Sequence, residues 1–238
     1  MINKFKRKFK EISKILRVTE KGNLELRKIQ GYNVLSNFKF NNIYLPFNSF
    51  SLNPDTIVDI LNDILLNERK SIIEFGSGIG TIYIAKLIKM YDLDVKFVSI
   101  DSDEVWIATL TKMLEKENLS DYVKLIKVKI VEIQEYNYKA QNKWHDIATV
   151  KKIAKDLNTI DMVIVDGPYG QICDFARYSA IPVLKDFLAE KFCVLLDDTN
   201  RKVEQEIFNE WEQILNRKGT FHHTYSKIIK QSKFVTEL

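Results

Sequence analysis

The 238-residue chain, with 45% hydrophobic and 29% charged residues, contains enough apolar material for one sizeable core. Its net charge is only +4, which excludes the basic field over the whole surface that many nucleic-acid-binding proteins carry. Cys173 and Cys193 have no nearby Cys or His partner, so neither a disulfide framework nor a zinc knuckle is expected, and with no membrane-spanning run or signal peptide we expect a soluble, cytoplasmic protein.

The first predicted element is a basic amphipathic helix within residues 1–17. Apolar residues recur there at helical spacing between closely spaced Lys and Arg residues, and such a stripe ordinarily packs on a domain or on a second subunit of a homodimer. An anionic membrane surface and RNA are the alternative partners. Residues 23–45 are predicted to form short strands, with a hairpin around Asn41 and Asn42. Residues 1–53 are therefore interpreted as an extension that caps or docks the main domain.

Strands and helices alternate from Pro54 to the end of the chain. The predicted strands are 71–75, 95–101, 123–130, 161–166, 192–197, 220–225 and 228–235. The predicted helices begin at Pro54 and then span 79–91, 103–117, 148–157, 171–189 and 202–215. Because this alternation buries strands on both faces, residues 54–238 are expected to form an α/β domain with a doubly wound, seven-stranded, mostly parallel sheet.

The first of these strands ends in a glycine-rich turn at residues 74–80 (EFGSGIG). Glycines let the backbone of such a turn approach a ligand closely at a helix N-terminus. The dinucleotide-binding fingerprint G-x-G-x-x-G needs glycine at position 81, where this chain has Thr81. The observed spacing, with Glu74 two positions ahead of Gly76, resembles motif I of the class I S-adenosylmethionine (SAM)-dependent methyltransferases.

The second strand ends at Asp101, where a carboxylate can accept hydrogen bonds from ribose hydroxyls. Asp103 is interpreted as the cap of the next helix. The methyltransferase resemblance implies that Asp101 binds the adenosine ribose and that Glu74 lies near the methionine end of SAM. Trp106 either covers the adenine or belongs to the core. The expected cofactor-binding residues are Glu74, Gly76, Ser77, Gly78, Gly80, Thr81, Asp101, Ser102 and Asp166.

Three carboxylates follow two further strands, Asp166 after one and Asp197 and Asp198 after the other. Side by side they would repel one another unless a metal, a substrate cation or Arg201 compensates. The pattern resembles O-methyltransferases of the catechol and caffeoyl-CoA kind, which hold Mg²⁺ at matching strand ends. Those enzymes carry Asp-Asn where this chain has Asp197-Asp198, whereas some sugar O-methyltransferases carry Asp-Asp. All three are therefore candidate Mg²⁺ ligands; the alternative is that Asp198 caps the next helix while Arg201 neutralises Asp197.

Asp166, Asp197 and His145 are the candidate catalytic residues. An unperturbed His is poised to exchange a proton near neutral pH, although a loop His is more often merely solvated. Arg177 either reaches the acceptor or a carboxylate, or lies on a helix surface. Residues 166–169 (DGPY) differ by one residue from the Asp-Pro-Pro-Tyr motif of amino methyltransferases.

The stretch from Phe47 to Trp211, about two thirds of the chain, resembles bacterial class I methyltransferases of unassigned substrate. The resemblance implies SAM as cofactor and methyl transfer to an oxygen of a small-molecule or glycan-linked acceptor. The alternatives are an RNA, protein or amino-group methyltransferase, a nicotinamide dehydrogenase, and a module that binds the cofactor without turnover. Thr81 argues against the dehydrogenase, and the weak net charge argues against nucleic acid as partner.

Overall fold

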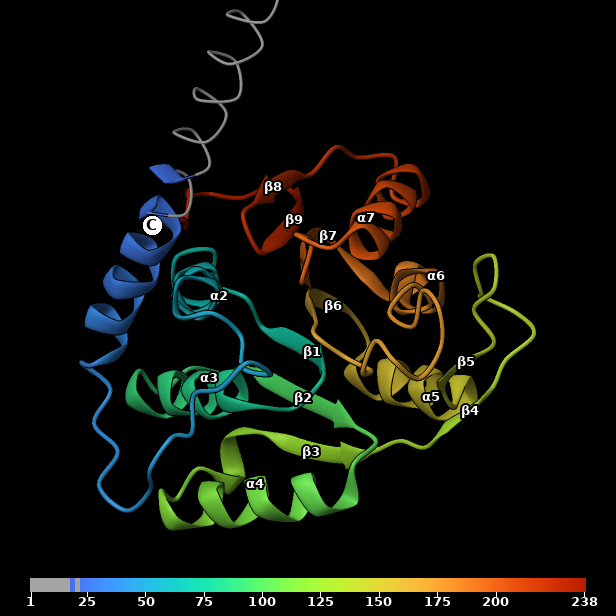
Figure 1. The fold of residues 1–238 in the computed structure, drawn as a ribbon. Coiled ribbons are helices and arrows are strands. Elements are labelled where there is room, and N and C mark those ends of the chain that lie inside the picture. Colours follow the sequence, from blue (N-terminus) through green and yellow to red (C-terminus); the bar gives the residue numbers. More distant parts are fainter. Residues whose placement is uncertain (1–17, 20–21) are drawn as a thin grey trace, which may run out of the picture.

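The computed structural model describes residues 18, 19 and 22–238, so the basic segment 1–17 that we expect to act in docking lies outside the described residues. A seven-stranded sheet forms the centre of the domain (Figure 1). Its strands, in spatial order, are β3 (Lys124–Lys127), β2 (Lys96–Asp101), β1 (Ser71–Phe75), β6 (Ile160–Val165), β7 (Leu188–Asp197), β9 (Tyr225–Lys230) and β8 (Thr220–His222).

The first five strands of that order are parallel, and β9 runs antiparallel to both β7 and β8. The chain builds outward from β1 to β3 and then returns to place β6 on the other side of β1. This reversal makes a topological switch point between β1 and β6, and ligands of open α/β sheets bind outside the carboxyl ends of strands at such a point. The expected doubly wound, mostly parallel sheet is confirmed.

Helices cover both faces of the sheet (Figure 1). One face carries α2 (Pro54–Leu66), α3 (Ile79–Met90) and α4 (Glu104–Lys116), and the other carries α5 (Ile147–Leu157), α6 (Ala180–Leu184) and α7 (Lys202–Ile214). Successive strand residues supply the two cores in turn, Ile72 to the first and Ile73 to the second, because side chains alternate along a strand. As expected, Asp103 caps α4 by accepting from the amides of Val105 and Trp106.

The expected strands in the N-terminal extension are wrong, because residues 22–35 are helical (Figure 1). Apolar residues recur at short intervals there, but most of them are exposed, and the helix is buried mainly at Gly31 and Leu35. A Cβ at Gly31 would lie 2.6 Å from the backbone of Pro54, so glycine is what allows this close approach to α2. The hairpin is also wrong: the Asn41 and Asn42 amides donate instead to Glu117 Oε1, at 2.9 and 2.7 Å.

The predicted helix over 171–189 is wrong as well. The chain after β6 forms turns, and only α6, followed by a 3-10 turn at Lys185–Phe187, is helical before β7 begins. The segment between β3 and β6, residues 128–159, is called the insertion. The predicted helix α5 is confirmed there, and the residues before it form a small antiparallel sheet that the sequence does not predict, β4 (Ile130–Glu132) with β5 (Lys143–His145). No helix in the described part of the chain is long and apolar enough to cross a bilayer.

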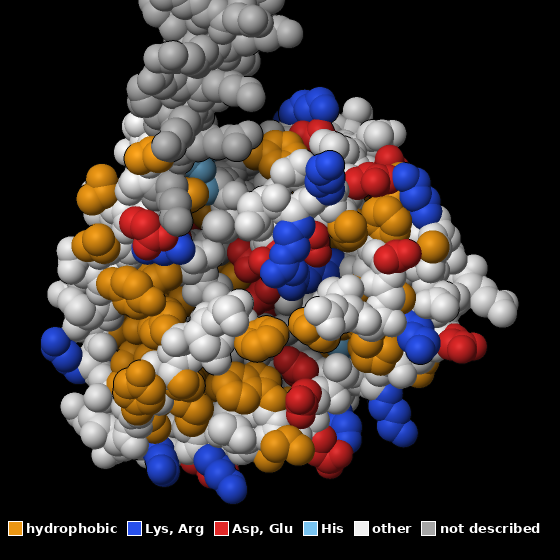
Figure 2. Space-filling model, viewed as in Figure 1, with side chains coloured by type: hydrophobic (Ala, Val, Ile, Leu, Met, Phe, Trp, Pro, Cys, Tyr) orange, Lys and Arg blue, Asp and Glu red, His pale blue; other side chains and the backbone are white. Residues whose placement is uncertain are grey.

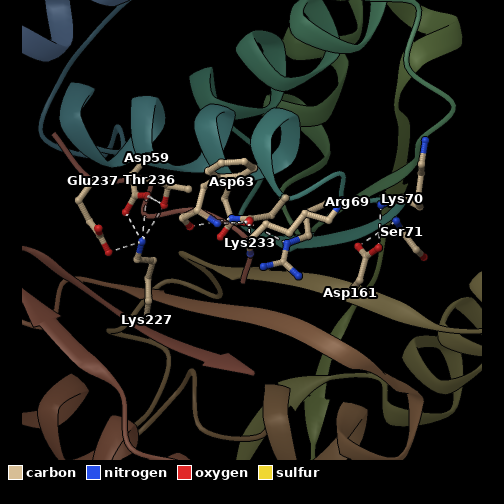
Figure 3. Close-up of polar contacts among 12 residues, drawn as sticks. Asp59, Asp63, Arg69, Lys70, Ser71, Asp161, Lys227, Lys233, Thr236 and Glu237 are labelled. Carbon is tan, nitrogen blue, oxygen red and sulfur yellow. Dashed lines mark hydrogen bonds and ion pairs between the residues drawn. The ribbon is translucent and has the colours of Figure 1, made fainter. Parts of the chain in front are cut away.

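A buried polar cluster ties the C-terminal tail to α2 (Figure 3). Lys227 Nζ on β9 lies 2.8 Å from Asp59 Oδ2 on α2 and 2.8 Å from Glu237 Oε1 on the tail. The Thr236 hydroxyl donates to Asp59 and accepts a hydrogen bond of 3.1 Å from Lys227 Nζ. Burying a charge is costly unless it is paired and hydrogen-bonded. Thr236 and Glu237 on the tail therefore supply hydrogen-bond and ion-pair partners to Asp59 and Lys227 that β9 and α2 alone do not provide.

We expect Thr236→Val to lower the free energy of unfolding by about 1–2 kcal/mol, because the isosteric side chain leaves the Asp59 carboxylate with one donor fewer in a buried place. Lys233→Ala is the matched control. Lys233 lies on the same tail and forms an ion pair with Glu68, and the side chains of both residues are exposed. Such a pair contributes about 0–1 kcal/mol. Urea unfolding measures both changes, and equal losses in the two variants would contradict a special role for the buried cluster.

Candidate functional site

A cleft of about 1430 Å³ lies at the carboxyl ends of the central strands. Its walls are the glycine-rich turn after β1, the ends of β2, β6 and β7, the start of α7, and residues 46–54 of the N-terminal extension. Pockets for one drug-sized ligand usually measure about 300–1,000 Å³. The cleft is therefore large enough for two ligands together, and it opens at the switch point where the topology places binding sites.

The first two of the three glycines in the turn, Gly76 and Gly78, have different roles. Gly76 has a φ of +92°, and a Cβ there would lie 2.8 Å from the Gly167 nitrogen, so this glycine lets the turn pack against the end of β6. A Cβ at Gly78 would meet nothing within 4 Å. Because Gly78 also lines the cleft, the protein does not need glycine at this position for its own packing, and the open space belongs to the cleft.

Glu74 supports the turn through a chain of buried hydrogen bonds. Its Oε2 accepts from the Ser99 hydroxyl at 2.5 Å and from the Thr81 hydroxyl at 2.6 Å, while Thr81 Oγ1 accepts from the Gly78 amide at 2.8 Å. Burial raises the pKa of Glu74 to about 7, although both hydroxyl bonds favour the charged form. Thr81, a predicted cofactor-binding residue, is fully buried and supports the turn through its hydrogen bonds with Glu74 and Gly78.

Asp101 is placed at the edge of the cleft by backbone amides. Its Oδ2 accepts from Ser77 at 3.0 Å, and its Oδ1 accepts from Ser102 at 2.6 Å and Asp103 at 2.9 Å. Burial raises the pKa of Asp101, while these three bonds oppose the rise. A carboxylate offers about four acceptor sites, so capacity remains for a ligand hydroxyl. Trp106 also lines the cleft, with its indole N–H donating to the Ser77 carbonyl at 2.7 Å.

The three aspartates at the ends of β6 and β7 meet as the sequence predicts. Asp166, Asp197 and Asp198 each offer an oxygen within 4.8 Å of the others, and all three line the cleft. Burial raises the pKa of Asp166 to about 7, and burial together with the neighbouring carboxylates raises the pKa of Asp197 well above its usual value. Asp197 Oδ1 is buried and has no hydrogen-bond partner within the described part of the chain.

Arg177 lies in the middle of this cluster, and only 4% of it is exposed. Its Nη2 is 3.2 Å from Asp166 Oδ1 and 3.0 Å from Asp198 Oδ2, and its Nη1 donates to the Asp197 carbonyl at 3.1 Å. Arg201 contacts Asp198, at 3.0 Å, and not Asp197 as the alternative interpretation required. Of the placements considered for Arg177, the contact with a carboxylate is confirmed, and the position on a helix surface is wrong.

His145 is placed differently from the loop residue that the sequence indicates. It lies on β5, is 1% exposed, and its Nδ1 is 3.2 Å from the Val128 carbonyl oxygen. Burial lowers its pKa to about 4. The prediction of a general base rests on an unperturbed pKa near neutral, and this environment removes that premise. His145 lines the cleft as a neutral ring beside Phe75 and Trp144.

Two exposed aromatic rings stand at the cleft. Tyr169 belongs to the DGPY segment (166–169) that the sequence singles out, whereas Phe50 was not predicted to lie here. Phe50, on the N-terminal extension, is 73% exposed, and Tyr169, after β6, is 54% exposed. Their ring centroids lie 6.1 Å apart in an edge-to-face arrangement, and both residues line the cleft. The extension therefore forms part of the binding site, and no local signal in the sequence distinguishes Phe50 from a core residue.

The charged side chains on the face shown in Figure 2 are interspersed, with Lys and Arg beside Asp and Glu. The described residues on this face form no broad field of a single sign of the kind that favours a nucleic-acid backbone.

The comparisons with known proteins identify the fold. No family model matches the sequence, and no curated protein matches it either. A putative caffeoyl-CoA O-methyltransferase from Staphylococcus aureus is 18% identical with a TM-score of 0.55, over 90% of this chain and 100% of that one. An O-methyltransferase from Bacillus cereus, in complex with SAH, is 10% identical with a TM-score of 0.54, over 86% and 90%. The O-methyltransferase TomG from Streptomyces achromogenes, in complex with SAM, is 11% identical with a TM-score of 0.54, over 87% and 90%. The chain has the class I methyltransferase fold.

Proposed function

We propose that the protein is a SAM-dependent methyltransferase that methylates an oxygen of a small-molecule or glycan-linked acceptor. The observation that carries the proposal is the cleft at the switch point, where the open turn at Gly78 and the fixed carboxylate of Asp101 stand beside a cluster of acidic side chains. The similar structures support it, since they are described as O-methyltransferases and two of them hold SAM or SAH.

The residues present fit SAM on two observations of this structure. The space beside Gly78 admits a ligand against the backbone of the turn, and Asp101 keeps acceptor capacity for a ribose hydroxyl. The acidic lining of Glu74 and Asp166 also suits a cofactor whose methionine end carries an ammonium and a sulfonium group. On this proposal the adenosine lies toward Asp101 and Trp106, and the methionine end lies toward Asp166.

SAM supplies an already activated methyl group, so the protein's task is to place the acceptor oxygen in line with it and to remove the proton. Asp197 is suited to that task, because its Oδ1 has no hydrogen-bond partner among the residues that the structure describes and its raised pKa makes it a stronger base. The hydroxyl of the acceptor donates to Asp197, which takes the proton as the oxygen is methylated. Phe50 and Tyr169 flank the acceptor side of the cleft.

Calorimetry and an SAH-release assay test the proposal. We expect SAM or SAH to bind with micromolar affinity, on the order of −8 kcal/mol, and NADH not to bind. Purified protein with SAM is then offered hydroxylated small molecules, glycans, amines, RNA and protein separately. SAH release with a hydroxylated small molecule or glycan supports the proposal. Release only with RNA, protein or amines would replace it by one of the other methyltransferase activities, and binding without release from any pool would indicate a non-catalytic module.

A further inference from the structure

The aspartate cluster consists of Asp166, Asp197 and Asp198, at the ends of β6 and β7. Three carboxylates this close need a cation, and methyltransferases whose pattern the sequence resembles hold Mg²⁺ at matching strand ends. In this chain a buried guanidinium already contacts two of the three carboxylates and the backbone of the third aspartate. We propose that Arg177 is the resident cation of the cluster and that the site works without a divalent metal ion.

The position of Arg177 conflicts with a metal at the same carboxylates. Mg²⁺ takes a near-octahedral shell of oxygen ligands about 2.0–2.1 Å away. An ion between Asp166 Oδ1 and Asp198 Oδ2 would lie where Arg177 Nη2 stands, 3.2 and 3.0 Å from these same oxygens. A guanidinium stays protonated in proteins and has no lone pair to offer, so it repels the ion and cannot ligate it. The residues present therefore do not fit Mg²⁺ while Arg177 holds this position.

The backbone on both sides of Arg177 is held in place. The Ala176 carbonyl accepts from Gln141 Nε2 at 3.3 Å, and the Tyr178 carbonyl accepts from the Trp211 indole N–H at 2.8 Å. Gln141 belongs to the insertion and Trp211 to α7, so two separate parts of the chain fix this segment. With its head group buried and its backbone anchored, Arg177 is a built component of the cluster, unlike Arg201, which is 54% exposed.

The two arginines contact only two of the three carboxyl groups in the cluster. Arg177 contacts the carboxylates of Asp166 and Asp198, and Arg201 contacts Asp198, whereas no salt bridge within the described part of the chain reaches the Asp197 carboxyl. Among the described residues, Asp197 Oδ1 has no hydrogen-bond partner. Arg177 thus occupies Asp166 and Asp198 and leaves Asp197 free to take a hydrogen bond from a ligand. In terms of the proposed function, on which this step rests, Arg177 is a positioning residue that directs the acceptor hydroxyl to Asp197.

Mn²⁺ binding tests the inference without an acceptor. Protein freed of metal with EDTA is titrated with Mn²⁺, and the free ion is followed by electron paramagnetic resonance. We expect the wild type not to bind Mn²⁺ at millimolar concentrations, and Arg177→Met, which removes the charge and keeps an apolar stem, to acquire a site in the micromolar range. Arg201→Met is the matched control and should acquire none, because Arg177 remains in place.

Stoichiometric Mn²⁺ binding by the wild type, abolished in Asp197→Asn, would overturn the inference, and so would a folded Arg177→Met variant that binds no Mn²⁺. If Arg177→Met does not fold, the wild-type and Asp197→Asn titrations decide the question alone. A wild type that excludes Mn²⁺ but binds no SAM would refute the proposed function, and with it the positioning role of Arg177, but would leave Arg177 as the resident cation of the cluster. Once an acceptor is known, EDTA should not change the rate of SAH release.

Discussion

Gly78→Val is expected to leave the fold intact and to weaken SAM binding by about 100-fold or more, equivalent to roughly 3 kcal/mol. A Cβ at Gly78 meets no protein atom within 4 Å, so the branched side chain enters the cleft, where it overlaps a ligand that lies against the turn. The backbone at Gly78 is extended, with φ −163°, which other residues also adopt. Calorimetry with SAM and a urea unfolding curve measure the two properties separately.

Gly22→Val controls for replacing a glycine by a branched residue, since Gly22 also has open space around it and lies on the helical extension away from the turn. It should keep SAM affinity. Gly76→Ala provides the contrast: with φ +92° and a Cβ 2.8 Å from the Gly167 nitrogen, it should lower stability itself. Wild-type SAM affinity in Gly78→Val would remove the turn from the cofactor site.

Asp197→Asn is expected to lower turnover by about 10²–10⁴-fold, the usual contribution of a general base, while SAM still binds. Asp166→Asn should lower turnover as well, because it removes the carboxylate that Arg177 contacts at 3.2 Å. The amide keeps the shape of the side chain and cannot take up the proton. In the wild type, turnover should rise as pH rises, because a base acts in its deprotonated form and the pKa values of both carboxyls are raised, that of Asp166 to about 7. The rise should disappear in Asp197→Asn. SAH release measured against pH, with an identified acceptor, gives both results.

Asp174→Asn is the matched control, because Asp174 is an exposed carboxylate that lines the same cleft outside the cluster. It should keep both the rate and the pH profile of the wild type. Full turnover in either cluster variant would exclude that aspartate from the mechanism.

The sheet and the cofactor side of the cleft were predictable because their signals are local. A run of apolar residues that ends in glycines predicts β1 and its turn, since few other residues allow a φ of +92° or leave space for a ligand. The alternation of strands and helices then places the residues that follow each strand at one edge of a parallel sheet. The sequence alone thus places Asp101, Asp166 and Asp197 at this edge of the sheet.

Other features depended on contacts between distant segments. The apolar spacing of residues 22–35 is compatible with strands as well as with a helix. The close packing of Gly31 against Pro54, which accompanies the helix, is a contact that the local sequence does not reveal. Phe50 belongs to the cleft only because the extension returns to the end of β6. His145 has an ordinary sequence context, and its lowered pKa follows from burial between elements that the pattern does not place.

The sequence by itself determined the fold class, the glycine turn and the meeting of three aspartates, because each follows from residue type and position at a strand end. Only the tertiary structure decided what balances those aspartates. Arg177 lies on turns whose conformation is set by Gln141 and Trp211, from an insertion and from a later helix. The energy of a buried charge depends on the atoms within a few ångströms of it, and in a folded chain those atoms come from segments far apart in the sequence.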